Sequence, residues 1–255
     1  MILAILQARM SSSRLPGKVL KPILGKPMLA LQIERILRSK KIDKLVLATS
    51  ADESDQPLED LAKSLGVSCY RGNLNNVLER FYKAAEIYNS EHIVRLTGDC
   101  PAIDPALIDS LITYYLKNNL DYAGLEPSYP DGLDVEVMRW KALGDAYHEA
   151  QLPSEKEHVT LFINKRPDRY RLGSIKNKID YSQLRWTVDE HKDFELITKI
   201  YESLYVRNPH FSWEDILEFV ESNPVLKTYN TEHKRNEGLV KSLLQDQVFL
   251  KGLVE

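Results

Sequence analysis

Apolar and polar positions along this chain predict strands and helices in alternation. Three segments dominated by apolar residues are typical of strands buried on both faces, at 2–6, 44–50 and 92–97. Between and after them, apolar residues at helical spacing predict helices that follow Pro27, cover 54–65 and 76–88, and follow the Asp104-Pro105 cap. A shorter strand is expected over 67–70. This order favours a mostly parallel sheet covered by helices on both faces.

The pattern changes after residue 120. We expect two strands within 121–138, two helices within 139–165, further strands at 170–175 and 182–188, then a helix around 194–204 and a last clear helix at 212–222. The remaining residues form a polar tail that ends in a moderately amphipathic segment. We therefore predict a main domain over 1–222 with an inserted lobe at about 121–180, and a C-terminal extension over 223–255.

Composition narrows the class of protein. The 255 residues are 43% hydrophobic and 28% charged, and the formal net charge of −3 does not favour a nucleic-acid or membrane-surface binder. Two cysteines make no disulfide framework, so we expect a reducing compartment, the cytoplasm. The first apolar run lacks a basic leader and is not expected to be a signal peptide, and no apolar segment approaches the ~20 residues that span a bilayer.

The loop after the first predicted strand carries the clearest chemistry. Arg9, Arg14 and Lys18 alternate there with serine hydroxyls and backbone amides. Ligands of open α/β sheets lie at the carboxyl ends of the strands, so this loop suits a phosphate-bearing anion. It is not a P-loop, because Ser12 and Val19 stand where that motif needs glycine and a hydroxyl residue. From the charges alone, a solvated basic loop is an equally good interpretation.

As a unit, the loop Ala8-Arg9 through Ser13-Arg14-Leu15-Pro16-Gly17-Lys18 resembles the signature of the sugar-acid cytidylyltransferases, the family of the CMP-Kdo and CMP-acylneuraminate synthetases. Further matches place the chain near the spore coat polysaccharide biosynthesis (SpsF-like) branch: Arg95 to Pro101, Gly132 to Glu136, Glu157 to Thr160, Trp186 to Asp189 and Arg235 to Gly238. The resemblance covers nearly the whole chain. It implies a three-layer α/β/α Rossmann-like fold of the nucleotide-diphospho-sugar transferases.

The resemblance also implies an activity, transfer of CMP from CTP to a sugar acid or related sugar with release of pyrophosphate, in surface polysaccharide biosynthesis. The residues expected to bind the nucleotide are Gln7, Ala8, Arg9, Ser13, Arg14, Lys18 and Asp99. Among them, Arg9, Lys18 and Asp99 are expected to take part in catalysis. The partners implied are CTP, a small sugar acceptor and a second copy in a homodimer. The preference for cytosine follows from the resemblance alone, and the residues leave the acceptor open.

Two aspartates are candidates for a metal site. Asp99 follows a buried strand, and Asp189 follows another predicted strand at 185–188. Two carboxylates at strand ends suit one Mg²⁺, which takes one or two carboxylates together with phosphate oxygens. The resemblance implies the same pair. The structural alternatives are a turn-forming Asp99 and an Asp189 that caps a helix starting near Glu190.

Four residues are candidates for the acceptor side. Asp134 and Glu136 lie two apart on a predicted strand and would face the same side, although a solvated edge strand explains them equally well. Arg95 lies within a buried strand, where we slightly favour pairing with an internal acid over contact with an acceptor carboxylate. His158 matches an acceptor-side position of the resembled family. Arg80 could reach the nucleotide or the acceptor, although we favour a surface role.

Two other functions compete with nucleotidyl transfer. Asp134-Val135-Glu136 is a D-x-E variant of the acidic metal motif of glycosyltransferases, which share this nucleotide-binding architecture. Against this interpretation, the R-L-P-G-K loop suits a triphosphate. The other alternative is a non-catalytic nucleotide-sugar-binding protein of a polysaccharide pathway.

Overall fold

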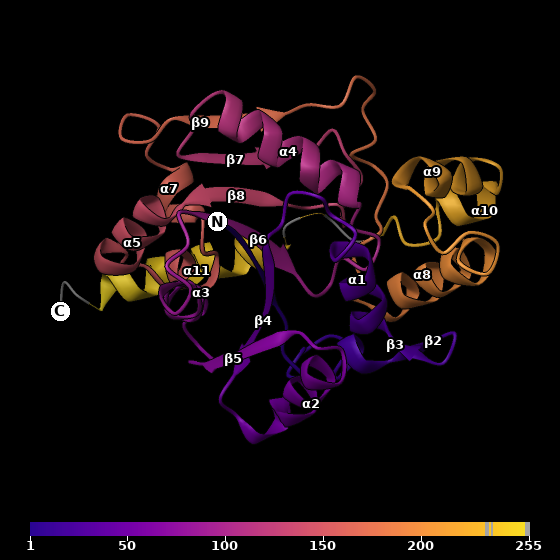
Figure 1. Ribbon diagram of the computed structural model, residues 1–255, viewed down its shortest axis with the longest axis horizontal. Helices are drawn as coiled ribbons and strands as arrows, with labels where there is room; N and C mark the ends of the chain where they lie inside the picture. The colour runs from indigo at the N-terminus through magenta and orange to yellow at the C-terminus, as the bar shows by residue number, and fades with distance from the viewer. Residues whose placement is uncertain (233–234, 236, 253–255) are drawn as a thin grey trace.

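A seven-stranded sheet forms the centre of the molecule in the computed structural model, which describes residues 1–232, 235 and 237–252 (Figure 1). Its strand order is β5-β4-β1-β6-β8-β7-β9. The bounds are β1 Ile2–Gln7, β4 Lys44–Ser50, β5 Ser68–Gly72, β6 His92–Thr97, β7 Tyr122–Leu125, β8 Glu136–Arg139 and β9 Leu172–Ile175. Of these strands only β8 runs against its neighbours. The segment 121–180 thus adds three strands to the same sheet.

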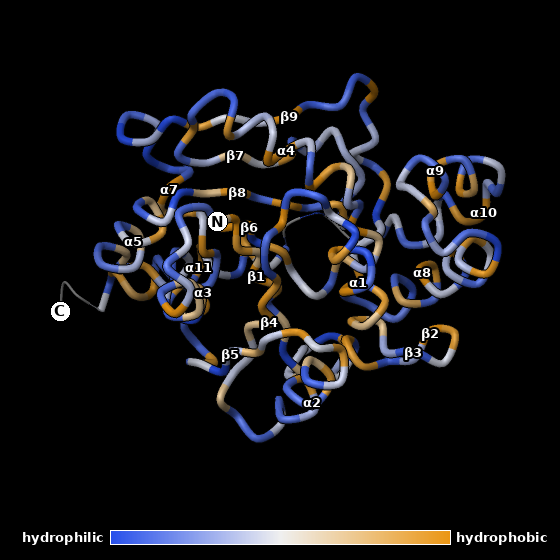
Figure 2. Tube along the Cα trace, in the orientation of Figure 1, coloured by the Kyte–Doolittle hydropathy of each residue, from blue (hydrophilic) through white to orange (hydrophobic). Residues whose placement is uncertain are grey.

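Helices cover both faces of the sheet because its central strands are apolar on both sides (Figure 2). Leu6 and its same-face neighbours pack under α1 Met28–Ile36, α2 Gln56–Ser64, α4 Pro105–Lys117, α8 His191–Leu204 and α9 Trp213–Glu221. Leu3 and Ile5 face the other way and pack under α3 Val77–Glu86, α5 Trp140–Glu149 and α7 Leu161–Asn164. The predicted three-layer α/β/α fold is confirmed.

The helix boundaries follow local chemistry that the sequence carries. Asp104 accepts hydrogen bonds from the amides of Ala106 and Leu107 at the start of α4, as predicted. Gly66, in the left-handed conformation at φ 67°, follows α2. The shorter elements are η1 Lys18–Leu20, η2 Glu53–Asp55 and the hairpin of β2 Pro22–Ile23 with β3 Lys26–Pro27.

Two predictions for the second half of the chain were wrong. Residues 182–188 do not form a strand of the sheet, and Arg185 makes only an isolated bridge to Asp131. The polar backbone groups of this segment bond to loops instead, for example from Trp186 N to Asp131 O at 2.6 Å. Residues 139–165 form three helices and not two, because α6 Pro153–Glu157 begins at a proline between α5 and α7.

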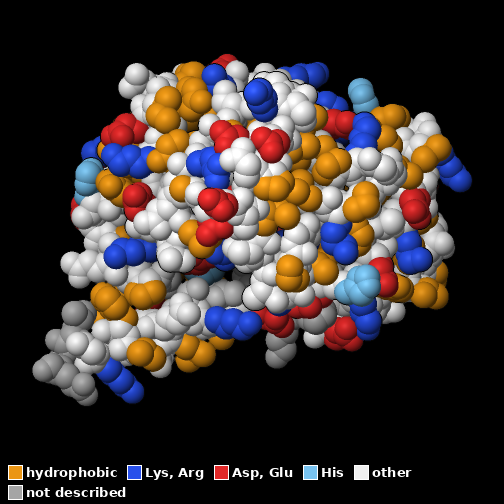
Figure 3. Space-filling model, turned by 90° about the horizontal axis from the view of Figure 1, so that it is seen from below, with side chains coloured by type: hydrophobic (Ala, Val, Ile, Leu, Met, Phe, Trp, Pro, Cys, Tyr) orange, Lys and Arg blue, Asp and Glu red, His pale blue; other side chains and the backbone are white. Residues whose placement is uncertain are grey.

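The C-terminal region is more structured than expected. The prediction of a last clear helix at 212–222 was wrong, because α10 Pro224–Lys227 and the longer α11 Glu237–Lys251 follow it. Asp246 of α11 accepts hydrogen bonds from the amide and hydroxyl of Ser154 at 2.9 and 2.5 Å. The outward side of α11 is apolar, with Val240, Leu244 and Val248 exposed, and Figure 3 shows such side chains on the part of the molecule that ends in grey.

No helix among the described residues is long and apolar enough to cross a membrane.

Candidate active site

The basic loop after β1 is folded by its own backbone. Gly17 adopts φ 68°, and its amide donates to Met10 O at 3.0 Å, which closes the loop on itself. The Met10 amide in turn donates to the buried carboxylate of Asp55 at 2.7 Å. Arg9, Arg14 and Lys18 are therefore presented from a short, internally bonded turn at the carboxyl end of β1.

A close approach of two strand ends brings Asp99 to this loop. The Gly98 amide donates to Gln7 O at 2.8 Å. A Cβ at position 98 would lie 2.9 Å from the Cβ of Ala8, which real side chains do not allow. Glycine is required here by the packing of β6 against β1, so that the next residue, Asp99, faces the basic loop.

A cavity of about 290 Å³ lies between this loop, the end of β6 and α11. All seven residues predicted to bind the nucleotide line it, namely Gln7, Ala8, Arg9, Ser13, Arg14, Lys18 and Asp99. Glu157, Gly238 and Lys241 close its other side. We call it the nucleotide cavity because the predicted nucleotide residues meet there; their individual roles stay predictions.

Lys18 joins the two predicted metal ligands. Its Nζ lies 2.9 Å from Asp189 Oδ1 and 3.9 Å from Asp99 Oδ2, and it donates to the carbonyl oxygen of Val188 at 2.5 Å. Asp189 also contacts Arg14 Nη2 at 2.9 Å. Burial alone would raise the pKa of Asp189, but attraction to Lys18 and Arg14 outweighs it and holds that pKa below its ordinary value. Asp189 is therefore ionised at neutral pH.

The backbone fixes the spacing of the two aspartates. Asp99 O accepts from Val188 N at 2.7 Å, one residue before Asp189. The alternative in which Asp189 caps α8 does not hold, because Glu190 is the N-cap residue and forms a capping box with Asp193. The carboxylate of Asp189 instead pairs with Lys18, Arg14 and Arg185 and lines the cavity together with Asp99.

The two carboxylates fit the predicted Mg²⁺ site. The Asp99 side chain is 32% exposed, and among the described residues its carboxylate oxygens have only long contacts, to Lys18 Nζ at 3.9 Å and from Cys100 Sγ at 3.5 Å. Within the described part of the chain there is no group of three or more histidine, cysteine and acidic side chains placed to hold a metal ion. Two carboxylates completed by phosphate oxygens are the arrangement that Mg²⁺ takes with nucleotides.

A second cavity of about 330 Å³ adjoins the first and shares Arg14, Asp99 and Asp189 with it. The four residues predicted for the acceptor line it: Arg95, Asp134, Glu136 and His158. We call it the acceptor cavity. The two predicted metal ligands therefore stand in the wall between the two cavities.

Arg95 and Glu136 form an ion pair at the base of the acceptor cavity. Glu136 also accepts from the hydroxyls of Tyr122 at 2.5 Å and Thr160 at 2.7 Å. Burial opposes ionisation of Glu136, but Arg95 and these donors outweigh burial and lower its pKa. The pairing of Arg95 with an internal acid, the interpretation favoured from the sequence, is what the structure has, and the pair faces the cavity as well.

Asp134 does not share a strand with Glu136, because β8 begins at Glu136; that prediction was wrong. Its Oδ2 accepts from the amide of Gly132 at 3.0 Å, and its Oδ1 pairs with Arg235 Nη2 at 2.6 Å. Gly132 needs φ 103°, and a Cβ there would lie 2.3 Å from Thr187 N. The loop that carries Asp134 is thus pressed against the segment that leads to Asp189.

His158 faces the same cavity from the end of α6. Its Nε2 lies 3.0 Å from the hydroxyl of Ser242 on α11. Burial, followed by repulsion from Arg95, lowers the pKa of His158 below its ordinary value. The imidazole is therefore neutral at pH 7 and acts as a hydrogen-bonding group.

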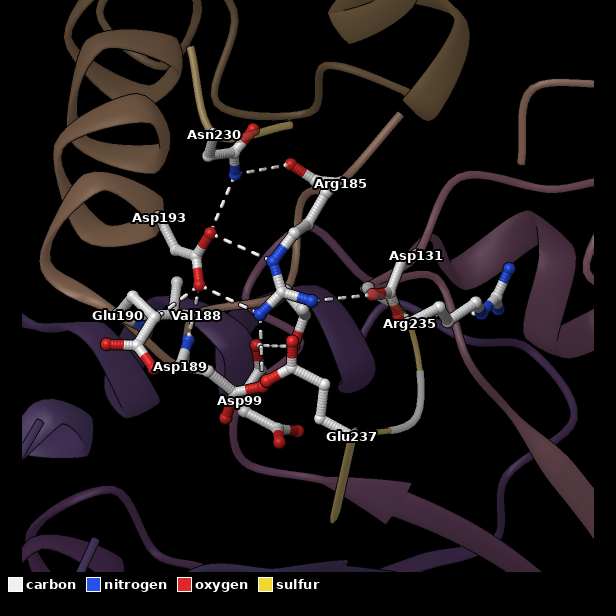
Figure 4. Close-up of polar contacts among 12 residues, drawn as sticks. Asp99, Asp131, Arg185, Val188, Asp189, Glu190, Asp193, Asn230, Arg235 and Glu237 are labelled. Atoms are coloured by element: carbon white, nitrogen blue, oxygen red, sulfur yellow. Dashed lines mark hydrogen bonds and ion pairs between the residues drawn. The ribbon is translucent and has the colours of Figure 1, made fainter. Parts of the chain in front are cut away.

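Arg185 is the main residue that sequence reasoning missed. Figure 4 shows its guanidinium between three carboxylates, those of Asp193 at 3.0 Å, Asp131 at 3.0 Å and Asp189 at 3.2 Å. Asn230 adds hydrogen bonds to Asp193 and to the Arg185 carbonyl. The signal in the sequence was an arginine inside the apolar segment 184–188, where a cation needs internal acids.

Asp131 was also missed. Burial, then repulsion from Asp134, raises its pKa to about 6, although Arg235 and Arg185 pull in the opposite direction. Arg235 comes from the tail motif noted in the sequence. Of that motif, Asn236 lies outside the described residues, whereas Glu237 and Gly238 line the acceptor cavity. The C-terminal region therefore contributes to both cavities.

Arg80 is not at the surface, contrary to expectation. Its side chain is 1% exposed and lines the nucleotide cavity from α3. Its Nη1 donates to Asn73 O at 2.8 Å, while its Nε has no hydrogen-bond partner among the described residues. Asn76 caps the start of α3, because its Oδ1 accepts a hydrogen bond from Glu79 N at 3.0 Å.

Most of this chain is similar to known proteins. The family model described as Cytidylyltransferase matches residues 3–232. The chain is 36% identical over 230 residues to the spore coat polysaccharide biosynthesis protein SpsF of Bacillus subtilis, covering 88% of this chain and 95% of that protein. It is 34% identical over 232 residues to an uncharacterised protein of Methanocaldococcus jannaschii, covering 90% and 94%. The structure of a cytidylyltransferase from Leptospira borgpetersenii, 30% identical, superposes with a TM-score of 0.85 over 90% of this chain and 97% of that one.

Proposed function

Because the chain belongs to the cytidylyltransferase family, as its motifs predicted, we propose that it transfers CMP from CTP to a sugar acid or related sugar, releasing pyrophosphate. The name of the SpsF relative supports a role in polysaccharide biosynthesis. One observation carries the proposal: the predicted nucleotide residues and the predicted acceptor residues line two adjoining cavities with Asp99 and Asp189 in the wall between them.

The arrangement suits in-line displacement at the α-phosphorus. The acceptor hydroxyl, held in its own cavity, attacks the α-phosphorus from one side and loses its proton as the new oxygen–phosphorus bond forms. The bond from the α-phosphorus to the bridging oxygen breaks, and that oxygen leaves with pyrophosphate. Arg9, Arg14 and Lys18 hold the triphosphate and offset the charge that develops on departing pyrophosphate. Most of the work of this chain is thus positioning and charge stabilisation.

Mg²⁺ is proposed as the cofactor, with Asp99 and Asp189 as the side chains that would hold it. When bound, the ion would polarise the phosphate and reduce repulsion between the triphosphate and the attacking hydroxyl. Lys18 contacts both carboxylates, so it would keep them in place before nucleotide and metal arrive. The proposed dimer and its cytoplasmic location stay predictions from the resemblance and the composition.

The glycosyltransferase alternative loses its main support in the structure. The acids of its D-x-E motif are engaged elsewhere, Glu136 by Arg95, Tyr122 and Thr160, and Asp134 by Arg235. The two acids also do not share a strand, because β8 begins at Glu136.

The test is release of pyrophosphate from each of the four nucleoside triphosphates, with and without Mg²⁺, in the presence of sugar acids and neutral sugars. We expect release with CTP only, dependent on Mg²⁺ and on one class of acceptor. Turnover of another triphosphate but not CTP would overturn the cytidylyl assignment. Binding of UDP-sugars in preference to CTP would favour the glycosyltransferase.

A non-catalytic role is tested in cells. If the protein acts only as a binding or assembly component, Asp99→Asn will leave polysaccharide formation intact. If it is the enzyme proposed here, the same change abolishes polysaccharide formation while the protein level is unchanged.

A further inference from the structure

Two arginines of this protein are equally buried but differ in what surrounds them. Arg35 of α1 and Arg80 of α3 are each 1% exposed. Arg35 donates to three carbonyl oxygens, those of Ile103, Phe211 and Ala102, at 2.7, 3.0 and 3.4 Å. Its guanidinium also lies 4.3 Å from the centre of the Phe211 ring. Arg35 is a satisfied structural cation.

Arg80 is not satisfied in the same way. Its one hydrogen bond is from Nη1 to Asn73 O, and within the described residues no carboxylate lies within 4.0 Å of its guanidinium. Nε has no partner there either. A buried guanidinium without a counter-charge costs several kcal/mol, so such a group persists where an anion or another strong acceptor arrives to pair with it.

The charged groups around Arg80 do not supply the missing counter-charge. Among the charged groups, Arg9 acts on it most strongly and repels it, while the carboxylates of Glu157 and Asp55 attract it more weakly. Glu157 lies 3.5 Å from Arg9, and Asp55 is already bonded to the Met10 amide and to the hydroxyls of Thr49 and Ser50. Arg9 and Arg80 thus line one cavity, and Glu157, the carboxylate that acts on Arg80 most strongly, is already paired with Arg9.

We propose that Arg80 is a binding residue for the phosphates of the nucleoside triphosphate and acts with Arg9 as a pair. The inference rests on the proposed function and adds to it a cationic group on α3, far in sequence from the basic loop. The guanidinium suits phosphate because its planar fork offers several N–H donors to the oxygens of one group.

The experiment compares Arg80→Met with Arg35→Met, since methionine removes the charge and keeps much of the volume. Calorimetric titration with CTP should show binding about 10- to 100-fold weaker for R80M, the loss typical of a charge-assisted hydrogen bond. The melting temperature of the unliganded R80M protein should be unchanged or higher, because an uncompensated cation has been removed. R35M should show the reverse, a lower melting temperature and unchanged CTP affinity of the folded protein.

A ligand series locates the contact. For R80M, the loss of affinity should be absent with cytidine, small with CMP and largest with CTP, and inorganic triphosphate should also bind more weakly. Arg80→Lys keeps the charge, so it should recover part of the triphosphate affinity. Equal losses with cytidine and CTP would overturn the assignment to phosphate and place the contact on the base or ribose.

The outcomes separate this inference from the proposed function. If the wild-type protein binds CTP and R80M binds it equally well, the role of Arg80 is wrong and the cytidylyltransferase assignment stands. If the wild-type protein binds inorganic triphosphate through Arg80 but shows no preference for CTP, the assignment of the nucleotide is wrong and the anion site stands. If R80M melts well below the wild type, as R35M is expected to, Arg80 is a structural residue.

Discussion

The two cavities share a wall but differ in charge. The nucleotide cavity is lined by five cationic side chains and three carboxylates, whereas the acceptor cavity is lined by three arginines and six carboxylates. In the acceptor cavity, Arg95 and Arg185 are neutralised by acids of this chain. The nucleotide cavity keeps a positive surplus that its triphosphate would neutralise. The nucleotide cavity can therefore bind an anion, whereas the arginines Arg95 and Arg185 of the acceptor cavity already have carboxylates of this chain as partners.

The difference in charge between the two cavities predicts which substitutions reduce activity and which reduce stability. Changes in the nucleotide cavity should reduce activity with little effect on stability, because the charges there have the substrate as partner. Changes to the ion pairs of the acceptor cavity should reduce stability first, because each removes a partner from a buried charge. Substitutions in each cavity test whether activity or stability is affected first.

Asp99→Asn should reduce pyrophosphate release about 1,000-fold, or about 4 kcal/mol in the barrier, because it removes a charge from the wall where the metal and triphosphate meet. Unfolding by urea should be nearly unchanged, since the side chain is 32% exposed. Asp168→Asn changes an exposed aspartate remote from both cavities and serves as the control. Full activity of D99N would contradict the role proposed for Asp99 in the wall between the two cavities.

Arg185→Met should lower the free energy of unfolding by about 3 kcal/mol, because Asp193 would stay buried without its cation and Asp131 would keep only Arg235 among the described cations. Arg171→Met is the matched control. Arg171 pairs with Asp121 at the surface, where the loss should be under about 1 kcal/mol. Urea titrations of both variants measure the loss of unfolding free energy. Equal losses would show that the ion pairs of Arg185 stabilise the protein no more than a surface ion pair does.

Asp131 should make stability depend on pH. Its folded-state pKa is raised to about 6 from its ordinary value of 3.8, so between those values the folded protein binds more protons than the unfolded chain. Stability that Asp131 contributes below about pH 4 is then lost as the pH rises through 6, by about 1–3 kcal/mol. The difference in unfolding free energy between wild type and Asp131→Asn should fall over this range. A difference that is constant or rises with pH would show that the two arginines dominate instead.

Ser13→Ala should have the smallest effect, a two- to five-fold rise in KM for CTP, as expected for one neutral hydrogen bond to phosphate. Ser11, two residues earlier in the same loop, is exposed and does not line the nucleotide cavity. Ser11→Ala should leave KM unchanged. If both variants change KM for CTP equally, the serines stabilise the loop and do not contact the ligand.

Sequence reasoning succeeded where function is carried by neighbouring residues. The basic loop gathers its cations within ten positions, and apolar runs of β1 and β6 show that it follows a buried strand and faces Asp99. Prediction from the sequence was weakest where a segment has no periodic pattern of apolar residues. Residues 182–188 have the composition of a strand but are bonded to loops, and no local pattern reports that.

By itself, the sequence determined the alternation of strands and helices, and hence the layers, because periodicity and capping are local properties. It also indicated the basic loop and the two aspartates, which the structure brings together in the lining of one cavity. Only the tertiary structure decided which charges are compensated. Arg185 meets Asp131 across 54 positions of the chain, Arg95 meets Glu136 across 41, and Arg80 meets no carboxylate among the described residues. Pairing of buried charges depends on distances between segments remote in sequence, and those distances are set by packing of the whole core.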